Sequence, residues 1–152
     1  MKNKRQIKLF SLGYQSKSLQ NYIDVLVASK VSIVLDVREK AWSYKPGFSK
    51  GQLDKALAAA GITYLHIRSA GNPSSNRKTA TSVEECLMRY RDHLHHNPEC
   101  LDEMWEVIEE ASQQKKAVCL TCFELEHEQC HRSILIEGLM DKQPRLQPVH
   151  LK

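Results

Sequence analysis

The run from Val31 to Val37 is the most apolar and β-branched stretch of the chain and reads Val-Ser-Ile-Val-Leu-Asp-Val. A run of this length and composition predicts a strand. Because it is apolar at almost every position and not only at alternate ones, the strand is expected to be covered on both faces, as the strands of parallel sheets are.

Strand and helix patterns alternate along the rest of the chain. Further strands are predicted at 7–13, 62–67, 117–122 and 146–151, and Pro148 places the last of these at an edge of the sheet. Helices are predicted at 19–29, 51–60, about 81–95, 100–113 and 133–140. Ser18 is expected to cap the first helix, and Gly61 follows the second. The turn formers of 68–77 predict an irregular, mobile loop.

Strands that alternate with helices are joined by right-handed crossovers, which produces a mainly parallel sheet between two layers of helices. At 152 residues the chain has the length of one domain with a full core. We therefore predict an α/β fold, a single-domain three-layer sandwich of residues 1–152 around a mainly parallel sheet of four to five strands.

The composition is that of a globular protein, because 41% of the residues are hydrophobic and 26% are charged. No apolar run approaches the roughly 20 residues of a membrane span, so no membrane partner is expected. The basic residues 1–6 are followed by a segment, 7–14, that is too short and polar for a secretory signal. Five cysteines, an odd number, fit reduced thiols better than disulfides. We expect a cytoplasmic protein.

The densest group of reactive side chains lies between the strand at 117–122 and the helix at 133–140, and consists of Cys122, Glu124, His127, Cys130, His131 and Arg132. The loop that leaves the carboxyl end of a strand is the usual ligand site of an open α/β sheet. The helix start that follows it favours an anion, because backbone N–H groups and the positive end of the dipole point there.

Two other predicted strands deliver polar side chains to the same edge of the sheet. Tyr14 follows the first strand, and Asp36 and Arg38 end the run that opens this section, with Ser43 in the loop that follows. We therefore expect one site in which Arg38 and Arg132 hold an anion and Tyr14 and Ser43 complete the wall. Asp36 and Glu124 are expected to orient the basic groups, with Asp36 acting on Arg132 or His131.

Cys122 is the candidate nucleophile, with Cys130 and His131 as further catalytic candidates, because nearby cations and a helix start lower the pKa of a thiol. The alternative is a buried strand cysteine that acts as a small hydrophobic side chain. Cys119 should face the other side of the strand and belong to the core. Zinc could draw ligands from Cys122, His127, Cys130 and His131, but Cys119 and Cys122 point to opposite faces, so we assign no metal and no cofactor.

A set of short motifs resembles one known family closely. The motifs are Leu12-Gly13-Tyr14, Asp36-Val37-Arg38, Ser43, Phe48-Ser49, Gly61-Ile62-x-Tyr64, Cys122-Phe-Glu124 and Cys130-His-Arg-Ser133. Over about 7–140 the chain resembles the DUF488 family, which is named for having no assigned function. The resemblance implies a compact α/β domain with these positions gathered at the carboxyl edge of the sheet. Ala41 and Asn72 stand where the family commonly has proline and glycine.

A weaker analogy links the chain to rhodaneses and cysteine phosphatases, in which a thiolate lies in a loop of N–H groups closed by an arginine. Nine residues separate Cys122 from Arg132, so this loop is longer than theirs.

We consider three hypotheses for function. The first is an anion-binding site for a small phosphate-bearing ligand, with thiol-dependent catalysis as the form to test first. The second is a non-catalytic module that binds nucleic acid or a protein through the loop at 38–48. The net charge of +4 and the lack of a long basic and aromatic stripe give nucleic acid little support. The third is a zinc-supported site. The oligomeric state is not predicted.

Overall fold

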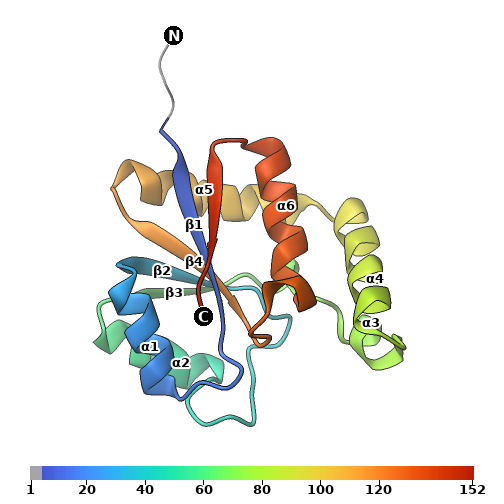
Figure 1. Ribbon diagram of the computed structural model, residues 1–152, viewed down its shortest axis with the longest axis horizontal. Coiled ribbons are helices and arrows are strands. Elements are labelled where there is room, and N and C mark those ends of the chain that lie inside the picture. Colours follow the sequence, from blue (N-terminus) through green and yellow to red (C-terminus); the bar gives the residue numbers. More distant parts are fainter. Residues whose placement is uncertain (1–4) are drawn as a thin grey trace.

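The computed structural model describes residues 5–152, and Figure 1 shows the order of their helices and strands. The basic segment noted above begins with residues 1–4, which lie outside the described residues. The five strands are β1 (Ile7–Gly13), β2 (Val31–Asp36), β3 (Thr63–His66), β4 (Ala117–Cys122) and β5 (Leu146–His150). The six helices are α1 (Leu19–Ala28), α2 (Lys50–Ala59), α3 (Ser74–Thr79), α4 (Val83–His96), α5 (Glu99–Gln113) and α6 (Arg132–Lys142). Two short 3₁₀ turns are η1 (Arg68–Ala70) and η2 (His127–Gln129).

The strands form one parallel sheet in the order β3-β2-β4-β1-β5. The predicted three-layer α/β sandwich around a parallel sheet is therefore confirmed, with five strands. β5 lies at an edge, as Pro148 predicted. The chain runs from β1 across to β2 and β3, and then returns to place β4 between β1 and β2. This return creates a switch point at the carboxyl ends of β1, β2 and β4, where open α/β sheets bind ligands.

Two separate cores fill the space between the sheet and its helices. One contains Tyr22 and Leu26 of α1 and Leu53 and Leu57 of α2. The other is built from α4, α5 and α6 on the opposite side. Cys119 belongs to the first core and Cys122 to the second, so the two cysteines face opposite sides of β4 as predicted.

The helix starts follow the local sequence. The hydroxyl of Ser18 accepts the Asn21 N–H at 3.1 Å and caps α1. Ser82 caps α4 in the same way through the Glu85 N–H at 3.0 Å. Each such cap stabilises its helix by about 1 kcal/mol. Short polar side chains therefore determine the residue at which each of these two helices begins.

The prediction of an irregular loop over 68–77 is wrong. This segment forms η1 and begins α3, and both Gly71 and Asn72 are buried. The hydroxyl of Tyr90 in α4 donates to the Ala70 carbonyl at 2.6 Å, and a Cβ on Gly71 would lie 2.2 Å from the Cα of Glu39. Turn-forming residues are used here for close packing, and this packing positions α3 and α4.

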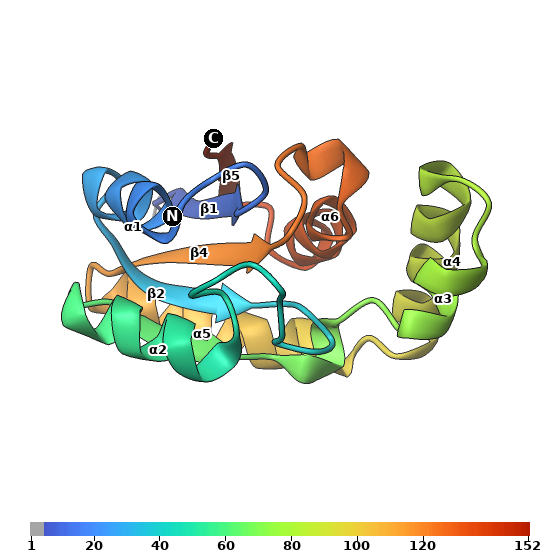
Figure 2. The same ribbon diagram turned by 90° about the horizontal axis from the view of Figure 1, so that it is seen from below.

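Helices α3 and α4 lie beyond the carboxyl end of the sheet, on the side toward which the arrows of β2 and β4 point (Figure 2). This placement makes them a wall for whatever binds at the strand ends. Within residues 5–152, none of the helices has the length and apolar character needed to cross a membrane.

Candidate functional site

The three strand ends that the sequence predicts to converge lie next to one another in the sheet. Gly13 of β1 pairs with Cys122 of β4, and Asp36 of β2 pairs with Thr121. A Cβ on Gly13 would lie 1.8 Å from the carbonyl oxygen of Glu124, so only glycine lets the loop after β4 fold back over β1. This close approach fixes the loop that carries the candidate catalytic residues.

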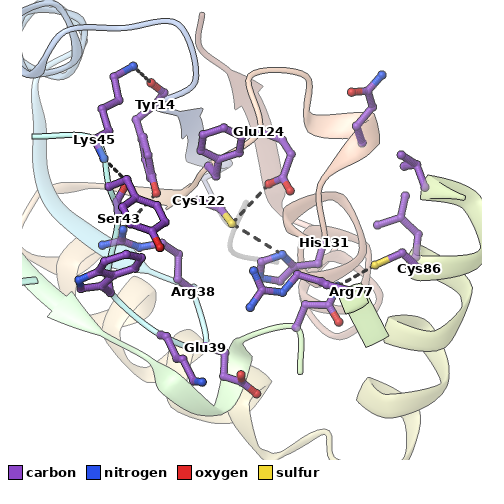
Figure 3. Close-up of a pocket in the computed structure, with 18 residues that line it drawn as sticks. Tyr14, Arg38, Glu39, Ser43, Lys45, Arg77, Cys86, Cys122, Glu124 and His131 are labelled. Atoms are coloured by element: carbon purple, nitrogen blue, oxygen red, sulfur yellow. Dashed lines mark hydrogen bonds between the residues drawn. The ribbon is translucent and has the colours of Figure 1, made fainter. Parts of the chain in front are cut away.

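A cavity of about 620 Å³ opens at these strand ends (Figure 3). Six of the nine predicted site residues lie in its wall: Tyr14, Arg38, Ser43, Cys122, Glu124 and His131. The remaining wall comes from the loop after β2, from the region of α3 and α4, and from the loop after β4: Glu39, Lys40, Trp42, Tyr44, Lys45, Asn72, Arg77, Val83, Cys86, Leu87, Phe123 and Gln129. Asp36, Cys130 and Arg132 lie behind the wall.

The imidazole of His131 is fixed in one orientation. Its Nε2 lies 2.7 Å from the carbonyl oxygen of Val37. Because a carbonyl only accepts, Nε2 carries a hydrogen and donates it. The Nδ1 atom therefore faces the two thiols, 3.8 Å from the sulfur of Cys122 and 3.8 Å from that of Cys130.

The negative charge of this thiol pair rests on Cys122. Its pKa is held well below that of an ordinary cysteine, first by the hydrogen bond from the Cys130 thiol and then by His131, against the opposing effect of burial. Burial and the neighbouring Cys122 raise the pKa of Cys130. Burial lowers the pKa of His131, but the Cys122 thiolate, the hydrogen bond to the Val37 carbonyl and the charge of Glu124 together raise that pKa above its ordinary value. The arrangement favours a thiolate beside an imidazolium.

Glu124 adds a carboxyl group to the same cluster. Its Oε2 lies 3.6 Å from the Cys122 sulfur, and burial, followed by the charge on Cys122, raises its pKa. A carboxyl group this close to the thiolate is suited to proton transfer. We expected the Glu124 side chain to orient a basic group; in the structure it is the Glu124 backbone carbonyl that accepts a hydrogen bond from Arg132, at 2.7 Å.

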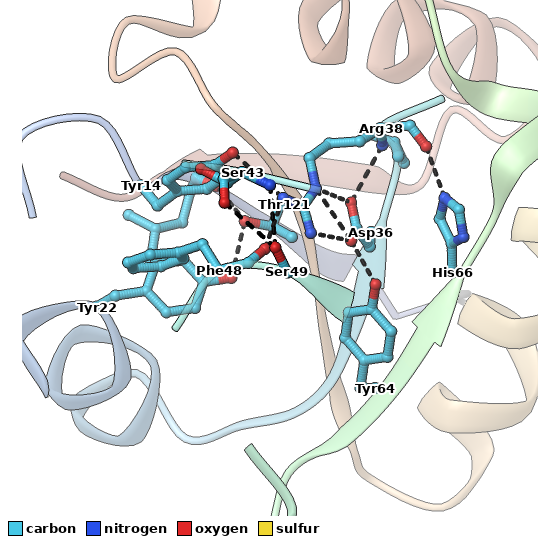
Figure 4. A network of polar contacts seen from close by, with 12 residues as sticks. Tyr14, Tyr22, Asp36, Arg38, Ser43, Phe48, Ser49, Tyr64, His66 and Thr121 are labelled. Atoms are coloured by element: carbon cyan, nitrogen blue, oxygen red, sulfur yellow. Dashed lines mark hydrogen bonds and ion pairs between the residues drawn. The ribbon is translucent and has the colours of Figure 1, made fainter. Parts of the chain in front are cut away.

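Asp36 and Arg38 form a buried ion pair beneath the cavity (Figure 4). The guanidinium donates to Asp36 at 2.9 and 2.7 Å and to the Phe48 carbonyl at 2.7 Å, and its Nη1 lies 3.2 Å from the Tyr14 hydroxyl. The Tyr64 hydroxyl donates to the same carboxylate at 2.5 Å. Asp36 thus orients Arg38, not Arg132 or His131 as predicted, because the two side chains leave the end of β2 on the same side. Arg38 reaches the cavity wall with its charge largely neutralised.

Arg132 does not reach the cavity, contrary to our expectation that it would hold an anion there. It is 1% exposed, and its Nε and Nη1 atoms have no hydrogen-bond partner among residues 5–152. The start of α6 is also closed, since the N–H of Arg132 donates to the Cys130 sulfur at 3.5 Å and the N–H of Ser133 donates to the Cys130 carbonyl. The N–H groups at this helix start are therefore turned toward Cys130 and not toward the cavity.

Three basic side chains in the cavity wall were missed by the sequence prediction: Lys40, Lys45 and Arg77. Lys45 is held in place, because its ammonium group donates to the Tyr14 carbonyl at 3.1 Å. Lys40 and Lys45 flank the aromatic residues of the loop at 38–48, a signal that was available in the sequence. Arg77 comes from α3, in the segment wrongly predicted to be irregular.

The donor atoms of Cys122, Cys130 and His131 lie within 4.8 Å of one another. Two thiolates and an imidazole are a donor set that zinc accepts, with a fourth position left for water or another ligand. The fourth residue considered from the sequence, His127, does not join them, because its ring stacks on His150 with centroids 3.4 Å apart. The cluster would therefore offer a metal three protein ligands.

The comparison with known proteins identifies the family of the chain. A family model described as Domain of unknown function DUF488 matches residues 18–139, which include β2, β4, the thiol pair and most of the cavity wall. The chain belongs to the DUF488 family. No curated protein and no solved structure gives a significant match. Membership in DUF488 assigns no chemistry to the cavity, so the residues of the cavity are the basis for a functional proposal.

Proposed function

We propose that this DUF488 protein binds a small anionic, phosphate-bearing ligand in the cavity and that Cys122 acts on it as a thiolate. The observation that carries the proposal is the position of the Cys122 sulfur, in the cavity wall and 3.8 Å from an imidazole nitrogen whose partners among residues 5–152 are the two thiols. A thiolate held beside an imidazole is the arrangement that activates cysteine nucleophiles.

The charge of the cavity wall supports an anionic ligand. Four Lys or Arg residues and two Glu residues line it. Arg38 is paired with Asp36, which leaves Lys40, Lys45 and Arg77 as the cations available to a ligand. Among residues 5–152, none of these three forms a salt bridge. A phosphate between them would gain charge-assisted hydrogen bonds.

The proposed reaction uses Cys122 as the nucleophile and His131 and Glu124 as the groups that transfer protons. The Cys122 thiolate forms a bond to an electrophilic phosphorus or carbon atom of the ligand. The bond from that atom to the leaving group breaks, and its electron pair departs with the leaving group, which takes a proton from Nδ1 of His131. Water then attacks the same atom, releases the thiolate and returns a proton to His131. Glu124, 3.6 Å from the sulfur, is placed to assist the second step.

Ligand protection of Cys122 tests this proposal. Iodoacetamide alkylation of the full-length protein is followed by mass spectrometry with and without pyrophosphate, at ionic strength matched by sodium chloride. We expect pyrophosphate to slow alkylation of Cys122 and Lys45→Ala to abolish the protection. Lys116→Ala, which removes an exposed lysine at the opposite end of β4, is the matched control. Equal rates with and without pyrophosphate would contradict anion binding beside the thiol.

A second candidate function is a non-catalytic module that binds nucleic acid or a protein through the loop at 38–48. The observation that favours it is the exposure of Trp42 at 59% and Tyr44 at 92%, with Lys40 and Lys45 beside them. Aromatic and basic side chains together are suited to stacking on bases and to phosphate contacts. This function predicts binding of single-stranded oligonucleotides that weakens steeply with salt and does not depend on Cys122.

The compartment is part of the same proposal. The five cysteines are free thiols, and three of them, Cys86, Cys122 and Cys130, lie at the candidate site. Free thiols persist in a reducing compartment, which supports a cytoplasmic location.

A further inference from the structure

Two of the buried cysteines share one imidazole but lie at different depths. Cys122 forms part of the cavity wall, whereas Cys130 is 1% exposed and lies behind that wall. Both sulfurs are 3.8 Å from Nδ1 of His131, and they lie within 4.8 Å of each other. A reagent in the cavity therefore meets Cys122 first and can reach Cys130 only through it.

We propose that Cys122 and Cys130 form a redox-active dithiol that reduces small-molecule disulfides, with Cys122 as the attacking thiol and Cys130 as the resolving thiol. This activity goes beyond the proposed function and does not depend on the ligand named there. The protein supplies both electrons, and the oxidant is a disulfide, R–S–S–R, bound in the cavity.

The reaction has two steps. The Cys122 thiolate attacks one sulfur of the disulfide, so that a Cys122–S–R bond forms, the S–S bond breaks and one thiolate, RS⁻, leaves. This RS⁻ takes the proton from Nδ1 of the His131 imidazolium, which leaves the imidazole neutral. Cys130 then passes its proton to His131 and attacks the Cys122 sulfur, which forms the Cys122–Cys130 bond and releases the second RS⁻. Protonation of both products gives two RSH, and the protein dithiol has been oxidised by two electrons.

Cys130 is placed to carry out the second step. It lies between η2 and α6, outside the helix, so its side chain can move toward β4 without breaking a helical hydrogen bond. The sulfurs must approach to about 2 Å to form a disulfide. The N–H of Arg132 at the start of α6 already contacts the Cys130 sulfur at 3.5 Å and favours its thiolate as it attacks.

The other cysteines are poorly placed to compete. Cys119 faces the opposite core, where burial raises its pKa to about 12. Cys100 lies in α5, and its pKa is raised to about 11, also mainly by burial. Cys86 lines the cavity from α4, where its sulfur accepts a hydrogen bond from Asn72 at 3.3 Å. Cys86 is thus the one alternative partner that a disulfide reagent could reveal.

The test uses the reduced full-length protein and oxidised glutathione, with acid quenching and intact-mass analysis over time. Trypsin leaves Cys119, Cys122 and Cys130 in one peptide, so cleavage after glutamate is used to separate Cys130 from the other two. The wild type should first gain one glutathione and then end two hydrogens lighter than the starting protein, with the peptides of Cys122 and Cys130 linked. Cys119→Ala, a matched change in the same strand, should behave like the wild type.

The two site variants should stop the reaction at different points. Cys130→Ser should retain one glutathione, and Cys122→Ser should acquire neither adduct nor internal disulfide above background. Circular dichroism checks that each variant is folded, and the order of adduct and disulfide in the wild type tests the proposal without any variant. Adduct formation on Cys130 before Cys122, a link from Cys122 to Cys86, or a tightly bound zinc ion that blocks both thiols would overturn it. Protection by pyrophosphate on the same proteins reports separately on the proposed function.

Discussion

Nε2 of His131 donates to the carbonyl of Val37 at 2.7 Å, across 94 residues of sequence. This bond joins the start of α6 to the end of β2 and turns the free nitrogen of the ring toward Cys122 and Cys130. A buried backbone carbonyl is therefore satisfied by the same side chain that activates the thiol. The position of the imidazole is a consequence of the fold and does not depend on a ligand.

Replacement of His131 should deactivate Cys122. In His131→Ala the thiolate loses its neighbouring cation and its pKa rises, and each unit by which that pKa exceeds 7 lowers the thiolate fraction at pH 7 about tenfold. We expect the rate of Cys122 alkylation by iodoacetamide at pH 7 to fall by at least about tenfold. His127→Ala, which removes a histidine outside the thiol cluster, should leave the rate close to that of the wild type. Equal loss in both variants would assign the effect to general disturbance of the loop.

The pH dependence of alkylation should reveal the lowered pKa of Cys122. Only the thiolate reacts, so the rate should rise with pH and level off well below the value of about 8.5 expected for a free cysteine. As the pH falls through the pKa of Cys122, its charge and its pairing with His131 are lost together. Glu124→Gln removes a neighbouring negative charge and should move the midpoint lower still. A wild-type midpoint at or above that of glutathione would show that the thiol is not activated.

The ion pair of Asp36 and Arg38 should matter for stability as well as for the site. Asp36→Asn leaves the buried guanidinium without its counter-charge, and removal of one partner of a buried pair costs about 3–5 kcal/mol of unfolding free energy. Urea denaturation followed by circular dichroism measures this loss. Asp54→Asn, on the exposed side of α2, should change stability by less than about 0.5 kcal/mol. An unfolding free energy of Asp36→Asn close to that of the wild type would mean that the Asp36 carboxylate does not hold the Arg38 guanidinium as an ion pair.

The contact of Gly13 with Glu124 predicts a specific effect of a small substitution. In Gly13→Ala the new methyl group meets the Glu124 carbonyl, so either β1 or the loop after β4 must move. Overpacking of this kind costs about 1–3 kcal/mol, and the displaced loop should also slow alkylation of Cys122. Gly51→Ala is the matched control, because a Cβ there meets nothing within 4 Å. If Gly13→Ala changed neither the unfolding free energy nor the alkylation rate of Cys122, the close contact between Gly13 and the Glu124 carbonyl would be contradicted.

The sequence was sufficient to predict most of the fold because apolar runs of strand length alternate with capped helices, as in Ser18 before α1. It also predicted which strand ends meet, since parallel strands bring their carboxyl ends to one edge. It could not show that Arg132 points away from the cavity, because that depends on the Glu124 carbonyl, which lies eight residues earlier and is brought close by the fold. Nor could it place α3 and α4, whose position depends on the packing of Gly71 against Glu39.

The proposed function requires an anion site that adjoins an activated thiol, and two alkylating reagents of similar size test both properties together. Iodoacetate is negatively charged and iodoacetamide is neutral, so the ratio of their rates at Cys122, relative to the same ratio for glutathione, reports the local potential. We predict a higher ratio for Cys122 than for glutathione at low salt, reduced by Lys45→Ala and by added salt but not by Lys116→Ala. A ratio equal to or below that of glutathione would contradict the central claim.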